Sequence, residues 1–341
     1  MTGRTGSRGE GLYLYAIIET AGLSDDWAAA GSDGVHIVQH GRFAALVRHT
    51  DEGPPAGHDR EELAARLMAH QNMIERAMAI APVLPVKFGT VAPDGQSVVR
   101  SLKAGSPAFA TAFQSMDGMV QFEVLATWDL ETVFAEIATE PAIREVKERL
   151  NGMANGLAHE ESVHLGALVK TSLERRRTRL GKNLLASMRT VSADVVANPL
   201  MDDKMVLNLA LLVRADRADV LDDCIETLDA AHGGQLAFRR VGPLPPHSFA
   251  TVEIVFLDTA SICRARGVLG VDADADAKAA LAAYRRLAKS VHPDLAGNRA
   301  GSERIRTLIE AYETLSAFAK ADGPVAVSVR RQEPAYGAGM V

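Results

Sequence analysis

The sequence has few of the features that define secreted, membrane-spanning or disulfide-stapled proteins. Only two cysteines occur in 341 residues, Cys224 and Cys263, and neither has a His or Cys neighbour at metal-ligand spacing. A disulfide framework is therefore excluded, and we expect two reduced thiols. No apolar run approaches the ~18 residues that a membrane span needs, and residues 1–10 lack the apolar core of a signal peptide. We expect a cytoplasmic protein that does not contact membranes.

Motifs that commonly carry catalysis or hold cofactors are also missing. The chain has no glycine-rich phosphate loop, no nucleophile elbow and no paired-cysteine site. His159 and His164 are five residues apart, whereas a zinc-protease helix needs its two histidines four apart to share one face. We therefore predict a protein that is not an enzyme, with no catalytic, cofactor-binding or metal-ligating residues. The alternative is a small-molecule enzyme on tandem ferredoxin-like domains.

Excess positive charge is absent too. The chain carries 37 Lys and Arg against 43 Asp and Glu, a net charge of −6. That balance disfavours nucleic-acid binding through bulk charge. The run Arg175–Arg177, with Arg179, is a local exception. Because no aromatic residues interleave with it, we favour a solvated helix face over a phosphate-binding patch, and we expect no nucleic-acid partner.

Strand and helix patterns are present along most of the chain. Short apolar runs over 12–18 and 206–213 predict buried strands. One helix has an apolar stripe at spacings of three and four, formed by Leu63, Leu67, His70, Ile74 and Ala77. We predict an α+β protein with two ferredoxin-like α/β sandwich domains, joined by long helices and followed by a small all-helical module. The predicted segments are a disordered leader (1–10), an N-terminal α+β domain (11–128), a helical bridge (129–200), a second α+β domain (201–258), the helical module (259–320) and a disordered tail (321–341).

The helical module contains the sharpest local motif, His292-Pro293-Asp294. A helix predicted over 277–290 precedes it, and a second amphipathic helix is predicted over 303–318. Pro293 stops the first helix, because proline disfavours helical dihedrals in the residue before it. The tripeptide therefore lies in the loop that joins two antiparallel helices.

This region resembles the J-domain family, on the tripeptide together with residues 268–271, 284–288 and 310–315. In that family the tripeptide and the basic helix before it contact an Hsp70-type chaperone and stimulate its ATP hydrolysis. The resemblance implies six partner-binding residues: Arg285, Arg286, Lys289, His292, Pro293 and Asp294. Two departures are Leu295, where a basic residue often follows, and residues 261–264, which lack the usual aromatic pair. The alternative is a structural helical cap.

Four further blocks, over 13–18, 84–90, 206–213 and 242–249, stand in the order found in the GvpL/GvpF family of gas vesicle proteins, which residues 11–257 resemble. The resemblance implies a two-domain α+β accessory or minor component located at the gas vesicle. Its implied partners are the small hydrophobic shell subunit, bound during assembly, and other gas vesicle proteins. Within the second block Lys87 is either a carboxylate anchor or a solvated strand-face lysine, and we favour the solvated lysine.

Overall fold

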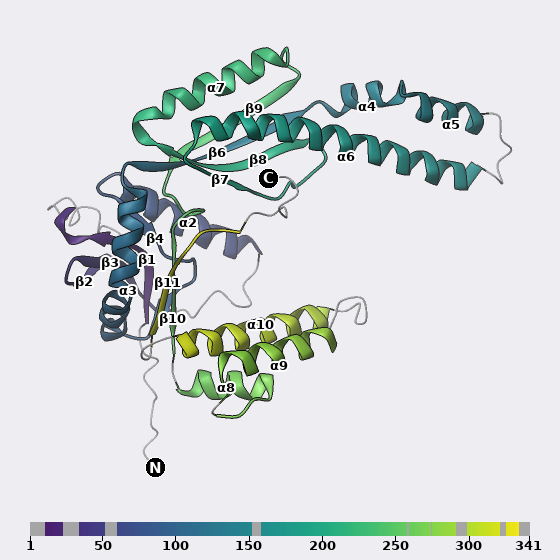
Figure 1. Cartoon of the computed structure of the whole chain (residues 1–341). Coiled ribbons are helices and arrows are strands. Elements are labelled where there is room, and N and C mark those ends of the chain that lie inside the picture. Colours follow the sequence, from purple (N-terminus) through teal and green to yellow (C-terminus); the bar gives the residue numbers. More distant parts are fainter. Residues whose placement is uncertain are drawn as a thin grey trace. The chain divides into compact units, whose positions relative to one another are not determined.

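The computed structural model describes residues 11–22, 34–51, 60–151, 158–257, 259–273, 275–290, 299–320 and 325–333. The chain divides into two compact units (Figure 1). Unit 1 comprises Met1–Asp117 and Ala250–Arg330, and unit 2 comprises Gly118–Phe249 and Arg331–Val341. Unit 1 is therefore discontinuous in sequence. This division falls after Asp117, Phe249 and Arg330, whereas the predicted segments divide at residues 128, 201 and 258.

Unit 1 is built on a five-stranded antiparallel sheet with the order β2-β3-β1-β4, in which β5 also pairs with β1. Its strands are β1 (Gly11–Glu19), β2 (Val35–His40), β3 (Phe43–Thr50), β4 (Val83–Pro85) and β5 (Val91–Ala92), and the 3-10 turn η1 (Thr20–Gly22) follows β1. A tight turn joins β2 and β3, with Gly41 at a φ of 59° that disfavours side chains. The central strand β1 is buried on both faces, as its uninterrupted apolar run predicts.

Two helices cover the two faces of this sheet. Tyr13 and Tyr15 of β1 pack with α2 (Arg60–Met78), whereas Leu12 and Leu14 pack with α3 (Gly95–Met116). Successive side chains of a strand point to opposite faces, so this alternation follows directly from the pleat.

A two-stranded ribbon of β10 (Thr251–Phe256) and β11 (Val325–Arg330) completes unit 1. Val252, Val325 and Phe109 of α3 share one apolar core, so the ribbon packs on α3. The prediction of a disordered tail over 321–341 is therefore wrong for Val325–Arg330. A period of two in Val325, Val327 and Val329 is the strand signal that the prediction missed.

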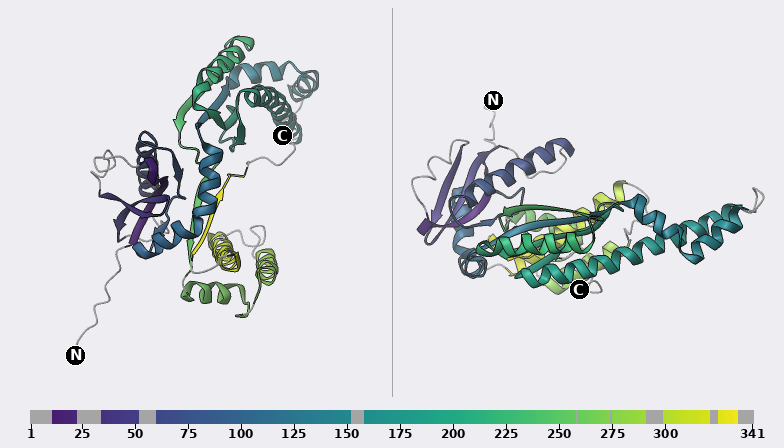
Figure 2. Two further views of the ribbon diagram at one scale, coloured as in Figure 1. Left: turned by 60° about the vertical axis from the view of Figure 1, so that its left-hand side comes forward. Right: turned by 90° about the horizontal axis from the view of Figure 1, so that it is seen from above.

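Unit 2 contains a four-stranded antiparallel sheet with the order β7-β8-β6-β9. Its strands are β6 (Met119–Trp128), β7 (Asp194–Ala197), β8 (Met205–Arg214) and β9 (Leu236–Leu244), and the 3-10 turn η3 (Ala215–Arg217) follows β8. Its helices are α4 (Leu130–Ala138), α5 (Pro141–Asn151), α6 (Ala158–Val191) and α7 (Ala218–Ala231). The predicted helical bridge is thus an insertion between the first two strands of this sheet, and α6 runs alongside α4 and α5 (Figure 2).

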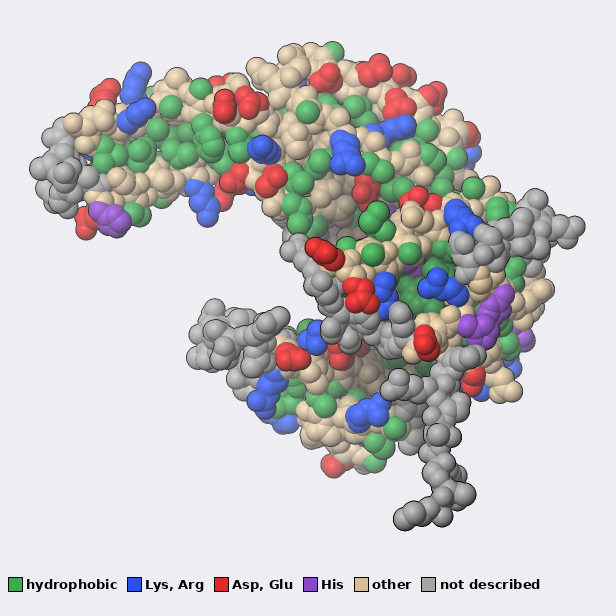
Figure 3. All heavy atoms as spheres, turned by 180° about the vertical axis from the view of Figure 1, so that it is seen from behind, with side chains coloured by type: hydrophobic (Ala, Val, Ile, Leu, Met, Phe, Trp, Pro, Cys, Tyr) green, Lys and Arg blue, Asp and Glu red, His purple; other side chains and the backbone are tan. Residues whose placement is uncertain are grey.

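The helices α4, α5 and α6 form an arm held by an apolar seam and by ion pairs. Ile143 of α5 and Leu173 of α6 lie in the core of unit 2, and Figure 3 shows apolar side chains along this arm bordered by charged ones. Arg175 and Arg176 each place a guanidinium nitrogen 3.0 Å from a Glu140 carboxylate oxygen. Arg175 remains exposed, as the interpretation of a solvated helix face predicts, whereas Arg176 is half-buried in its ion pair.

Candidate functional site

The helical module consists of α8 (Thr259–Leu269), α9 (Ala277–Ser290) and α10 (Arg299–Lys320). Its core is formed by small and aliphatic side chains from all three helices: Ile262, Ala265, Leu269, Ala280, Ala283, Leu308, Ala311 and Leu315. Tyr284 and Tyr312 stack beside that core, with ring centroids 5.1 Å apart. Asp276 starts α9, because its carboxylate accepts a hydrogen bond from the Ala279 amide at 2.8 Å.

Arg285, Arg286 and Lys289 of α9 are all exposed, as predicted for a face that meets a partner. The other three predicted partner-binding residues, His292, Pro293 and Asp294, lie outside the described residues. Whether these six residues bind a partner stays a prediction. The structure does give α9 a cationic outer face and an apolar inner one, which is the charge distribution that steers an acidic surface.

The module is spliced into unit 1 at both ends. Strand β10 leads into α8, and α10 is followed by β11, which pairs with β10 from Phe256↔Val325 to Thr251↔Arg330 (Figure 1). Leu257 belongs to the module core, and Val255 and Ala326 of the ribbon pack against it. An insertion anchored by two paired strands has far less freedom than a terminal appendage on one linker.

The block over residues 84–90 is fastened to the ribbon by charge and by backbone bonds. The Lys87 amide donates to the Val252 carbonyl at 2.9 Å, and its Nζ lies 3.0 Å from a Glu253 carboxylate oxygen. Arg330 of β11 reaches the same carboxylate at 2.7 Å. Lys87 combines the two interpretations: its side chain is 58% exposed, as the favoured solvated lysine predicts, and it also pairs with the Glu253 carboxylate.

The same block is fastened to α2 by a buried histidine. His70 Nε2 lies 3.1 Å from the Val86 carbonyl oxygen, which can only accept, so Nε2 donates and Nδ1 accepts from the Tyr13 hydroxyl at 2.9 Å. The Gly89 amide donates to that hydroxyl at 3.2 Å. Burial lowers the pKa of His70 to about 4 and raises the pKa of Tyr13 to about 12. Both groups are therefore neutral near pH 7, and their role here is structural.

The proline-rich block over residues 242–249 is held in unit 2 by one buried amide. Gln121 of β6 is fully buried, its Oε1 accepts from the Ser248 amide at 2.9 Å, and its Nε2 lies 3.0 Å from His247 Nε2. The hydrogen bond from the amide to Nε2 leaves His247 Nδ1 to donate to the Pro245 carbonyl at 3.1 Å. The block is a structural element, as are residues 84–90.

With this architecture in place, the comparisons with known proteins define the class of protein. Residues 11–251 match the family model described as gas vesicle synthesis protein GvpL/GvpF, and the chain belongs to that family. Residues 267–321 match the DnaJ domain. The predicted family and the predicted J-domain module are both confirmed. Across the described residues, no helix is long and apolar enough to cross a bilayer.

Individual relatives agree with this assignment. The chain is 31% identical over 242 residues to gas vesicle protein F of Streptomyces sp. (strain CB03234), covering 70% of this chain and 98% of the relative. The crystal structure of GvpF from Anabaena sp. PCC7120 is similar in fold, with a TM-score of 0.57 at 22% identity over 70% of this chain and 97% of that one. A curved DNA-binding protein of Pseudomonas putida (strain W619) is 48% identical over 48 residues, 14% of this chain and 15% of that protein.

Proposed function

We propose that this protein assists gas vesicle assembly by binding the hydrophobic shell subunit and recruiting an Hsp70-type chaperone through α9. The observation that supports the proposal is that the DnaJ domain is inserted between β10 and β11, the two strands of the ribbon, in a chain of the GvpL/GvpF family. A chaperone recruited by such a module is held close to whatever the body binds, which raises its effective concentration at the bound subunit. The protein acts at the gas vesicle, with other gas vesicle proteins as partners, and is not an enzyme.

The proposed fold of unit 2 is a ferredoxin-like sandwich enlarged by an insertion. Its elements follow the order β6, helices, β7, β8, α7, β9, which is the β-α-β-β-α-β order of that motif. Unit 1 has a related sheet order, with α2 between β3 and β4. On this interpretation, α4, α5 and α6 take the position of the first helix of the ferredoxin-like motif. The arm that they form adds exposed surface to unit 2 in addition to that of its sheet.

Shell-subunit binding is tested by affinity capture of the full chain from cells that produce gas vesicles. We expect the shell subunit to co-purify with the wild-type chain at low stringency, because the body would cover apolar surface that otherwise aggregates. The control is an unrelated protein with the same tag in the same cells. If the shell subunit is absent from the captured material at low salt and without detergent, the proposed function is wrong.

Chaperone recruitment gives a second prediction. Replacing Arg285 and Arg286 with Glu should reduce stimulation of Hsp70 ATP hydrolysis about tenfold, because the reversed face repels the acidic surface it is proposed to meet. The measurement is steady-state ATP hydrolysis by the purified chaperone. Arg304→Glu is the matched control, since Arg304 is equally exposed but lies on α10. Equal stimulation by the double variant and the wild type would show that α9 does not recruit the chaperone.

A further inference from the structure

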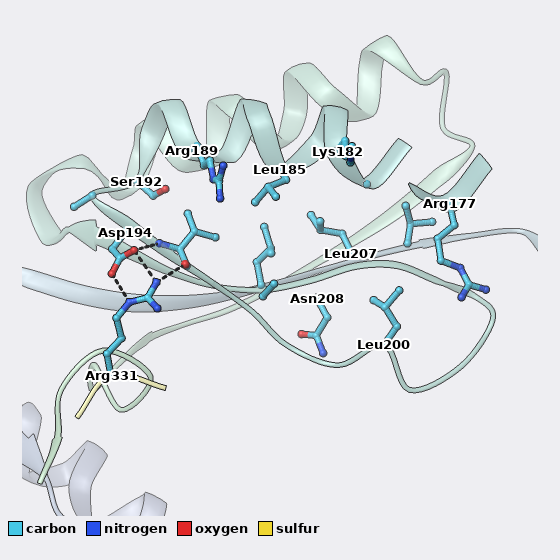
Figure 4. A pocket seen from close by; sticks show the side chains of 16 residues that line it. Arg177, Lys182, Leu185, Arg189, Ser192, Asp194, Leu200, Leu207, Asn208 and Arg331 are labelled. Atoms are coloured by element: carbon cyan, nitrogen blue, oxygen red, sulfur yellow. Dashed lines mark hydrogen bonds and ion pairs between the residues drawn. The ribbon is translucent and has the colours of Figure 1, made fainter. Parts of the chain in front are cut away.

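A hollow of about 540 Å³ opens in unit 2 between α6 and the strands β7 and β8 (Figure 4). Its apolar walls come from the helix, from both strands and from the loop between them: Leu185, Val195, Ala197, Leu200, Val206, Leu207 and Leu209. At Gly181 the helix approaches so closely that an added Cβ would lie 3.2 Å from the Val206 carbonyl oxygen. This volume lies in the range of pockets that bind small molecules or hold a few side chains.

The rim of the hollow is strongly cationic. Arg177, Lys182, Arg189 and Arg331 line it, with Asp194 as the one carboxylate among its described lining residues. This concentration of positive charge contrasts with a net charge of −6 for the whole chain. An apolar hollow with such a rim complements a partner that carries both apolar and acidic groups.

Two of the four cations are already paired, and two are available to a partner. Arg177 Nη2 lies 2.7 Å from an Asp203 carboxylate oxygen, and Arg331 Nε lies 2.7 Å from Asp194. Lys182 and Arg189 are exposed and form no ion pair within the part of the chain that the structure describes. They lie seven residues apart on α6 with Leu185 between them, so all three share one helix face. Figure 4 shows Arg189 extending from the helix toward the strands.

One wall of the hollow is an edge strand. β7 pairs with β8 on one side, and no described strand pairs with its other side. The Val195 carbonyl accepts from Arg331 Nη2 at 2.7 Å, and the Val195 amide donates to the Asp194 carboxylate at 2.7 Å. The side chains of Asp194 and Arg331 therefore satisfy the amide and the carbonyl of Val195. Covering backbone groups in this way protects an edge strand from the addition of another strand.

We infer that this hollow is where unit 2 holds the shell subunit, through a segment whose apolar side chains enter it and whose carboxylates face Lys182 and Arg189. The inference rests on the proposed function, because it names the surface used for that partner. Apolar anchors in a pocket, surrounded by charges that set register, carry most of the binding energy in many interfaces.

The test is a charge reversal on the exposed helix face. In the full chain, Lys182→Glu with Arg189→Glu should weaken binding of purified shell subunit at least tenfold, measured by titration against immobilised protein at low salt. The matched control is Arg179→Glu, because Arg179 is exposed on the same helix but does not line the hollow. Circular dichroism and the unfolding midpoint of each variant establish that the fold is retained.

A second measurement locates the contact directly. A photoreactive benzoyl-phenylalanine at Asn208, which lines the hollow, should form an adduct with the shell subunit, whereas the same group at Arg179 should not. If the double variant binds the shell subunit as well as the wild type does, and no adduct forms at Asn208, then the shell subunit does not bind in the hollow. The proposed function would still stand in that case. No binding by the wild type would instead overturn the proposed function. Adducts at Asn208 that join two copies of this chain would identify a self-association surface and overturn the inference.

Discussion

Lowering the pH from 7 to 5 should reduce the free energy of unfolding of unit 1 by about 2 kcal/mol through His70 alone. Burial lowers the pKa of His70 to about 4 in the folded chain, whereas an unfolded histidine has a value near 6.5. Below pH 6.5 the unfolded chain therefore binds a proton that the folded chain cannot accept until about pH 4. The stability contributed by neutral His70 is complete above pH 7 and is lost progressively as the pH falls toward 4.

His70→Gln tests this expectation, because glutamine can still donate to the Val86 carbonyl but does not titrate. The variant should lose about 2 kcal/mol less than the wild type between pH 7 and pH 5. The measurement is urea unfolding followed by hydrogen exchange in peptides from β1 and β4, which report on unit 1. His49→Gln is the control, since His49 is exposed on β3 and should keep the wild-type slope. Identical slopes for His70→Gln and the wild type would contradict the prediction.

The helix that carries His70 shows what periodicity can predict and where it stops. Spacings of three and four correctly indicate a helix with one apolar stripe. Along that stripe Ile74 and Ala77 are 2% exposed, but Leu63 and Leu67 are 37% and 49% exposed. Periodicity specifies a face of a helix, whereas the length over which that face is covered depends on where the sheet ends. That second quantity is a property of the tertiary structure.

Strand pairing explains why the two units differ from the predicted segments. β6 lies within residues 11–128, the predicted N-terminal domain, whereas it is a central strand of the sheet of unit 2. β10 lies within residues 201–258, the predicted second α+β domain, whereas it pairs with β11 in unit 1. An amphipathic strand can complete any sheet with a free edge, so local sequence does not decide between them.

The helical module could be predicted from the sequence, because a local motif specifies it. Contacts between residues that are far apart in the sequence could not. The helices around the tripeptide lie close to the predicted positions, because their apolar spacing is local. The ion pairs of Lys87 and Arg175 join residues that are far apart in sequence, and each lysine or arginine alone is indistinguishable from a solvated one. The hollow beside β7 was missed for the same reason, since α6 and β8 meet only in the folded unit.

Replacing Val327 with Asn should lower the free energy of unfolding of unit 1 by about 2 kcal/mol, through lost apolar burial and the cost of placing an amide against a core. Val327 packs against the core that contains Phe109, and a Cβ added at Gly105 of α3 would lie 2.7 Å from its Cγ1. The strand and the helix are therefore in direct contact at this residue. The measurement is urea unfolding with hydrogen exchange in peptides from α3 and β1.

Ser328→Asn introduces the same amide one residue later, where the pleat directs it away from α3, and it should change the stability by less than about 0.5 kcal/mol. If both variants unfold like the wild type, β11 does not belong to the core of unit 1. The contrast also bears on the helical module, because β11 is one of the two strands between which α8, α9 and α10 are inserted. Weakening β11 should therefore leave the module tethered mainly through β10, so that Val327→Asn, but not Ser328→Asn, increases hydrogen exchange at the Val255 amide as well as in α3.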